Sequence, residues 1–127
     1  MEDKTKALCE ELMLIIMIIF NERGKGILFY SLYPVFNYGF GTISDLLKVL
    51  VNEGYVNVIF DLKEQPEDYP DEFLPKEEQI KKLHLCNHYT TYIFPTSEGL
   101  QFVKNNLKQA IEENREIKFT GLLHPLK

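Results

Sequence analysis

The chain has 127 residues, enough for one domain whose core buries roughly two thirds of the surface that the unfolded chain exposes. Apolar residues make up 45% and charged residues 26%, which excludes a disordered tail, a collagen-like fibre and a disulfide scaffold. The net charge of -5 argues against a protein that coats nucleic acid without specificity, because such affinity comes from excess Lys and Arg. It does not exclude a local basic face.

Cysteine usage and the apolar N-terminal run indicate the compartment. Cys9 and Cys86 form no CxxC pair, which favours reduced thiols and a cytoplasmic location. The apolar run 12–20 follows acidic residues, unlike a signal peptide, and a membrane-spanning helix needs about 20 apolar residues. We therefore expect no membrane association. The excess of Lys over Arg suits an AT-rich genome, such as that of a low-GC bacterium or its mobile elements.

The spacing of apolar residues predicts a first helix over residues 4–22, ended by Gly24 and Gly26. One face carries Leu8, Leu12, Ile15, Ile16 and Ile19, and the other carries Met13, Leu14, Met17, Ile18 and Phe20. A helix that is apolar all round must be covered on all sides. Either the C-terminal elements or a second copy of the protein can do this. The second possibility predicts a homodimer whose interface includes Leu12, Ile15, Ile16 and Ile19.

Residues 27–41 are rich in aromatics and predict a short helical segment interrupted by Pro34, followed by a turn with two glycines. Thr42 is the expected N-cap of the next helix, with Asp45 three positions later. This helix ends at Gly54 and has an unbroken apolar stripe: Ile43, Leu46, Leu47, Leu50 and Val51.

The second half of the chain predicts two strands and two helices. Strands are expected over 55–62 and 89–94, and the proline-rich stretch between them excludes regular structure in its first half. Its second half, 76–83, predicts a short helix. A last helix begins after Pro95 with a Thr or Ser cap, and its apolar face carries Leu100, Val103, Leu107, Ala110 and Ile111. The tail from Arg115, in which Ile117 and Phe119 alternate, predicts an edge strand or a segment packed on the first helix.

Two stretches resemble winged helix-turn-helix transcriptional regulators of the PadR and MarR kind. ISDLLKVLVNEGYVNV resembles the recognition helix and first wing strand, and YIFPTSEGLQFV resembles the second wing strand and the entry to the closing helix. The likeness covers 42–62 and 89–112. It implies one α+β winged-helix domain with four parts: an apolar N-terminal helix and turn (1–26), the helix-turn-helix and first wing strand (27–62), an insert (63–88), and the second wing strand, C-terminal helix and tail (89–127). The insert is longer than a typical wing, and Pro34 and the aromatics depart from the usual second helix.

The resemblance implies that the helix over 42–53 reads double-stranded DNA in the major groove. Its polar face offers Thr42, Ser44, Lys48 and Asn52, whereas Asp45 would oppose binding near phosphate. Lys81 and Lys82 would add a wing contact to phosphate. The function expected on this basis is a dimeric DNA-binding regulator of transcription, replication or segregation.

The charge distribution keeps a second function open. Residues 64–78 carry seven acids and one base, a net charge of -6, so the rest of the chain sums to +1. The alternative is a winged-helix module that docks a protein partner through this acidic insert or through the aromatic segment. No enzyme signature or phosphate-binding glycine loop is present, and no cofactor is indicated. His84, Cys86 and His88 invite a zinc site, but no fourth ligand is indicated, so no metal is expected.

Overall fold

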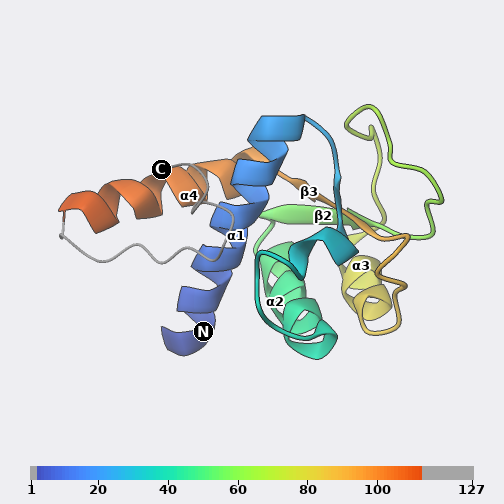
Figure 1. Ribbon diagram of the computed structural model, residues 1–127, viewed down its shortest axis with the longest axis horizontal. Helices are drawn as coiled ribbons and strands as arrows, with labels where there is room; N and C mark the ends of the chain where they lie inside the picture. The colour runs from blue at the N-terminus through green and yellow to red at the C-terminus, as the bar shows by residue number, and fades with distance from the viewer. Residues whose placement is uncertain (1–2, 113–127) are drawn as a thin grey trace.

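The computed structural model describes residues 3–112 and shows an α+β arrangement built around the first helix (Figure 1). The helices in this range are α1 (Asp3–Arg23), α2 (Phe40–Asn52), α3 (Lys76–Leu83) and α4 (Ser97–Glu112), with a 3-10 turn, η1 (Phe29–Leu32). The strands are β1 (Ile27–Leu28), β2 (Val56–Ile59) and β3 (Tyr92–Pro95). The predicted α+β class is confirmed, and each predicted helix within the described range is present.

The three strands form one antiparallel sheet in the order β1-β3-β2. Ile93 in the central strand faces Ile27 on one side and Val58 on the other. All three side chains are buried, because the sheet lies against α1 and the apolar face of α2. The sheet thus joins the N-terminal segment to the two strands on either side of the insert.

The packing of α1 accounts for the apolar residues on both of its faces. It packs on α2, on β1 and β3, and on α4, so several elements of the same chain cover it. The four residues predicted to form a dimer interface are almost completely buried in this core: Leu12, Ile15, Ile16 and Ile19, none more than 6% exposed. Their assignment to a dimer interface is wrong, because their surface is already covered within one chain.

Helix α2 has the predicted apolar stripe but begins earlier than predicted. Its first residue is Phe40, and the N-cap is Gly39, whose carbonyl accepts from the Ile43 amide at 3.0 Å. No side chain caps this end. Thr42 is therefore an exposed residue of the first turn and not the N-cap. The helix ends as predicted before Gly54, whose φ of 80° is a left-handed conformation that glycine adopts without strain.

Both predicted strands around the insert are shorter than expected. The first ends at Ile59, and Asp61 has a φ of 60°, which turns the chain away from the sheet. The second begins at Tyr92 because a turn comes first, in which the Asn87 side chain accepts from the Tyr89 amide at 2.8 Å. Local side-chain bonds of this kind compete with strand pairing.

The insert divides into two parts that lie on different sides of the molecule. Its proline-rich half returns to the sheet, where Gln65 donates to the Gly26 carbonyl at 2.8 Å and the Tyr69 hydroxyl donates to the Pro95 carbonyl at 3.0 Å. Its second half forms α3, which runs beside α2 (Figure 1). The acidic loop is thus held at the sheet, while α3 covers one flank of α2.

Helix α4 begins as predicted. The Thr96 hydroxyl accepts from the Gly99 amide at 3.0 Å and donates to the Gly54 carbonyl at 2.7 Å, so Thr96 is the cap and also ties α4 to the end of α2. The predictions for the tail from Arg115 lie outside the described residues.

Candidate functional site

The residues predicted to read DNA do not share one accessible face. Thr42 and Asn52 are exposed at opposite ends of α2. Ser44 is only 2% exposed, and its hydroxyl has no hydrogen-bond partner among the described residues. The prediction that Ser44 contacts DNA is wrong, because the side chain lies on the buried side of the helix.

Lys48 is partly covered at the surface and is paired with neighbouring side chains. Its side chain is 15% exposed, and its Nζ contacts the Asp45 carboxylate at 3.4 Å and both ring nitrogens of His84, with 2.6 Å to Nδ1. A lysine ammonium only donates, so it is paired here with a carboxylate and an imidazole. The one lysine of α2 is therefore not free to neutralise a phosphate in this conformation.

Helices α2 and α3 run in opposite directions. Lys48, in the middle of α2, meets His84 after the end of α3, whereas Lys76 at the start of α3 donates to the carbonyl of Asn52 at 2.9 Å. The end of α3 consequently lies near the beginning of α2. Thr42 is on the same end of the pair as the last turn of α3, and Asn52 is on the other.

The last turn of α3 carries the two exposed lysines predicted to contact phosphate. Lys82 lies 5.9 Å from the centre of the Phe60 ring, a cation–π geometry. Lys81 and Lys82 border a shallow pocket of about 370 Å³, together with Phe60, Asp61 and Leu85. Asp61 is exposed there, so the basic character of this end is partly offset.

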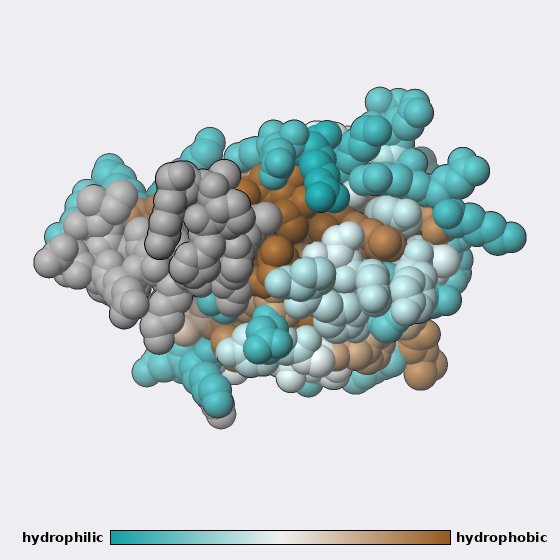
Figure 2. Space-filling model, in the orientation of Figure 1, coloured by the Kyte–Doolittle hydropathy of each residue, from teal (hydrophilic) through white to brown (hydrophobic). Residues whose placement is uncertain are grey.

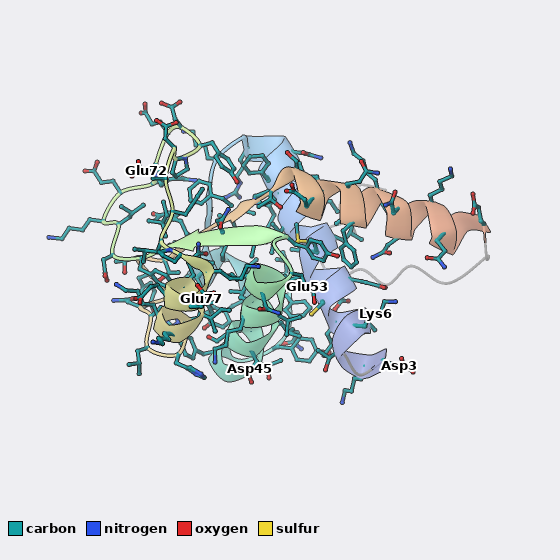
Figure 3. The ribbon with its side chains drawn as sticks, turned by 180° about the vertical axis from the view of Figure 1, so that it is seen from behind. Asp3, Lys6, Asp45, Glu53, Glu72 and Glu77 are labelled. Carbon is teal, nitrogen blue, oxygen red and sulfur yellow. The ribbon has the colours of Figure 1, made fainter. Side chains whose placement is uncertain are left out.

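Carboxylates dominate the rest of the exposed surface of the pair. The Asp45 side chain is 74% exposed, and Glu53, directly after α2, is also exposed. Figure 3 shows both side chains along α2 and Glu77 on the neighbouring α3. Surfaces that bind DNA without base contacts are built mainly from Lys and Arg, so the face of α2 lacks the charge that phosphate requires.

A group of aromatic side chains forms a second surface at the end of the molecule where α3 ends and α2 begins. We call it the tyrosine patch: Tyr30, Tyr33, His88 and Tyr89. The Tyr30 and Tyr89 rings lie 4.7 Å apart, and the Tyr33 hydroxyl is 3.0 Å from His88 Nδ1. Tyr30 is 45% exposed and Tyr89 is 59% exposed. Leu85, on the loop that leads to Tyr89, is 91% exposed.

The backbone holds the two halves of the patch together. The Tyr30 amide donates to the His88 carbonyl at 3.0 Å, and the Phe29 amide donates to the Thr91 carbonyl at 2.8 Å. These bonds extend the pairing of β1 with β3. Burial raises the pKa of the Tyr33 hydroxyl, so this group remains a neutral hydrogen-bonding partner of His88.

Sequence reasoning noticed the aromatics of 27–36 but missed Tyr89. These residues are far apart in the chain, and only the β1–β3 pairing brings them together. Leu85, two residues after the end of α3, is also exposed, a property that only the folded structure shows.

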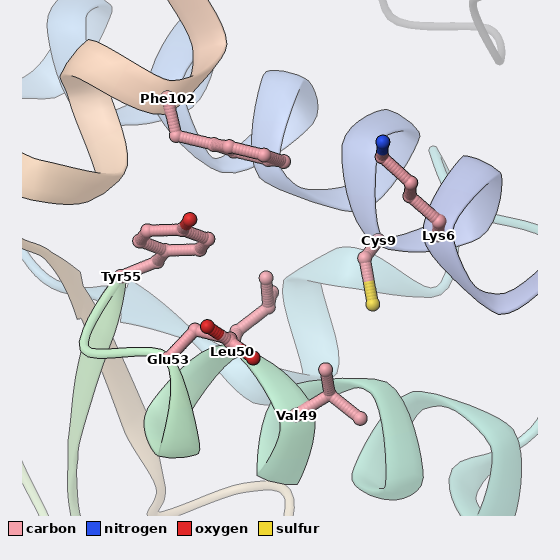
Figure 4. Close-up of a pocket in the computed structure, with 7 residues that line it drawn as sticks. All are labelled: Lys6, Cys9, Val49, Leu50, Glu53, Tyr55 and Phe102. Carbon is pink, nitrogen blue, oxygen red and sulfur yellow. The ribbon is translucent and has the colours of Figure 1, made fainter. Parts of the chain in front are cut away.

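A pocket of about 420 Å³ lies between α1, α2 and α4 (Figure 4). Tyr55 and Phe102 stack on one side with ring centres 4.5 Å apart, and Lys6 and Glu53 also line it. Cys9 is 2% exposed there, and burial, with smaller effects of nearby carboxylates, raises its thiol pKa to about 11. The thiol is thus protonated near neutral pH and packs as a buried apolar group, which is not the environment of a nucleophilic cysteine.

Two of the three residues that invited a zinc site, from which no metal was expected, make other contacts. His84 contacts Lys48, and His88 contacts Tyr33. Within residues 3–112, no group of three or more His, Cys, Asp or Glu side chains is placed to hold a metal ion. In the same range, no helix combines the length and apolarity needed to cross a membrane.

Comparison with known proteins identifies no relative: no family model, curated protein or solved structure matches the chain.

Proposed function

We propose that this chain is a winged-helix-like domain that docks a partner protein through the tyrosine patch. The chain order of helix, short helical turn, helix, strand, insert, strand and helix is the order that the resemblance to winged-helix regulators implies. In this proposal α2 corresponds to the recognition helix that the resemblance implies.

The single observation that carries this proposal is the exposed Tyr30–Tyr89 pair. Backbone hydrogen bonds between the two segments hold the pair in place. Tyrosine is enriched at interfaces because its ring buries a large apolar area while its hydroxyl still finds a hydrogen bond. A rigid surface also loses little conformational entropy on binding. The carboxylates and the covered lysine of α2 favour a protein over DNA as the partner.

A photo-crosslinking residue at position 89 tests the proposal in the cells that make the protein. We expect one discrete adduct, identified by mass spectrometry, that disappears in the Tyr30→Ala variant. The control places the same residue at Tyr69, which is 45% exposed on the insert, away from the patch. Equal products from both positions, or none from position 89, would refute docking through this surface.

DNA binding is the second candidate, and one observation favours it. Lys81 and Lys82 are exposed on the last turn of α3, close to the uncapped start of α2 where Thr42 is also exposed. A DNA site would therefore use this end of the helix pair and not the length of α2.

Fluorescence anisotropy with the chain's own upstream DNA at low salt distinguishes the two functions. If DNA is the partner, a Lys81→Ala/Lys82→Ala variant binds more weakly and its salt dependence falls by about one to two ion-release equivalents. Glu77→Ala on the same helix is the matched control. Absence of salt-sensitive binding at micromolar protein excludes the DNA function.

A further inference from the structure

The pocket between α1, α2 and α4 has the size of a small-molecule site. Its volume of about 420 Å³ falls in the range of about 300–1,000 Å³ that such sites have in proteins. We call this hollow, lined by the residues labelled in Figure 4, the interhelix pocket. No residue of the tyrosine patch lines it, so it is separate from the proposed docking surface.

Part of the interhelix pocket is apolar. Tyr55 and Phe102 stack with ring centres 4.5 Å apart and ring planes 18° apart, so each ring holds the other in position. Figure 4 shows these rings on one side and Cys9 on the other. Leu50 is 1% exposed, and the Cys9 thiol is protonated near neutral pH, so both act as apolar surface. A ring or a branched side chain of a ligand would lose its water between these surfaces.

Two side chains of opposite charge line the same pocket. Lys6 lies in the first turns of α1 and Glu53 directly follows α2, and both are exposed (Figure 3). Among the residues that the structure describes, neither side chain has an ion-pair partner. Glu10 and Glu53 both help to raise the pKa of Cys9, so negative charge acts inside the pocket. The face of α1 turned to the viewer in Figure 2 shows apolar side chains instead.

We propose that the interhelix pocket binds a small zwitterion with an apolar side chain, of the chemical class of the aromatic and branched α-amino acids. The ligand carboxylate pairs with the Lys6 ammonium, the ligand ammonium pairs with the Glu53 carboxylate, and the side chain packs against the aromatic pair. A ligand with only a carboxylate would be repelled by Glu53, and a ligand with only an ammonium by Lys6. A wholly apolar ligand would remove water from both charges without pairing either. A zwitterion matches both.

Chemical-shift titration of the isotope-labelled full chain with L-phenylalanine tests the proposal. We expect saturable shifts at the amides of Cys9, Leu50 and Phe102. Two probes of the same ring each lack one charge: 3-phenylpropionate has no ammonium, and 2-phenylethylamine has no carboxylate. Each should bind at least about threefold more weakly than L-phenylalanine, because one exposed ion pair is lost.

Variants at the two charges show which contact each makes. Glu53→Gln should bind L-phenylalanine and 3-phenylpropionate equally well, because the ligand ammonium has lost its partner. Lys6→Gln should bind L-phenylalanine and 2-phenylethylamine equally well for the corresponding reason. Glu22→Gln and Lys25→Gln, near the other end of α1, are the matched controls and should keep both preferences. All four side chains are exposed, so the variants should fold as the unchanged protein does.

Three results would overturn the proposal. The first is the absence of saturable shifts with L-phenylalanine, L-tyrosine and L-leucine at millimolar concentration. The second is equal binding of L-phenylalanine and either singly charged probe by the unchanged protein. The third is a shift of the same amides on dilution without any ligand, which would assign the pocket to a second copy of the protein.

Discussion

Gln79 is the residue that fixes α3 beside the sheet, and replacing it with Met tests that role. The side chain is 1% exposed. Its Oε1 accepts from the Val58 amide at 2.8 Å, and its Nε2 donates to the Leu74 carbonyl at 2.8 Å and to Asn57 Oδ1 at 3.1 Å. One buried side-chain amide thus pairs with a backbone amide of the edge strand β2 and with a backbone carbonyl of the loop that leads into α3.

The expected loss follows from these three bonds. In Gln79→Met the buried Val58 amide has no acceptor, which costs about 1–3 kcal/mol. The Leu74 carbonyl and the Asn57 side chain are partly exposed and recover water, so each adds about 0.5–1 kcal/mol at most. Methionine has a similar shape and recovers about 1 kcal/mol by apolar burial. The free energy of unfolding should fall by about 1–4 kcal/mol.

Urea denaturation measures this change, with Glu78→Ala as the control because Glu78 is exposed on the same helix. The control should stay within about 0.5 kcal/mol of the unchanged protein. Hydrogen exchange at the Val58 amide should accelerate in Gln79→Met before the rest of β2 responds. If Gln79→Met is as stable as the control, the Gln79 hydrogen bonds do not anchor α3. The reasoning that these bonds hold α3 against α2 would then be refuted.

Three further predictions concern the closing helix and the core thiol. Gly99→Ala should destabilise the protein by more than about 2 kcal/mol in urea, because the new methyl group would overlap the Tyr55 carbonyl oxygen; Gly41→Ala, with no atom within 4 Å of the new methyl group, should not. Thr96→Ala should cost about 1–2 kcal/mol through loss of the cap, and Thr96→Ser should recover most of it. Because the pKa of Cys9 rises to about 11 in the folded state, the unfolded state releases this proton first, so stability should fall as pH rises from about 9 to about 11. Cys9→Ala should lack that fall in pH-dependent denaturation, and an equal fall in the variant would contradict the burial of the thiol.

Most of the secondary structure could be predicted because its signals are local. The stripe of α2, the Thr96 cap and the short helix over 76–83 each depend on residues within a few positions of one another. Errors arose where a side chain or a turn competed with the pattern. Thr42 resembled a cap, but the backbone at Gly39 began the helix first, and the turn at Asn87 shortened the last strand.

The candidate site was predicted less well because accessibility depends on distant segments. The helical period placed Ser44 and Lys48 on the polar side of α2, which was correct for an isolated helix. In the folded chain α3 packs against that side, and His84 and Asp45 pair with Lys48. The contact between Tyr30 and Tyr89 has the same origin, since sheet pairing joins two segments that no local pattern connects.

The amino-acid sequence by itself determined the four helices and the strands β2 and β3 of residues 3–112, the buried stripes and the acidity of the insert, but not strand β1. Periodicity, capping residues and prolines act over one or two turns, so these features do not depend on the rest of the fold. Only the tertiary structure decided that the apolar face of α1 is covered within one chain, that the acidic loop lies at the sheet, and that α3 covers a flank of α2. Those outcomes depend on which apolar faces meet, and many distant contacts settle that together.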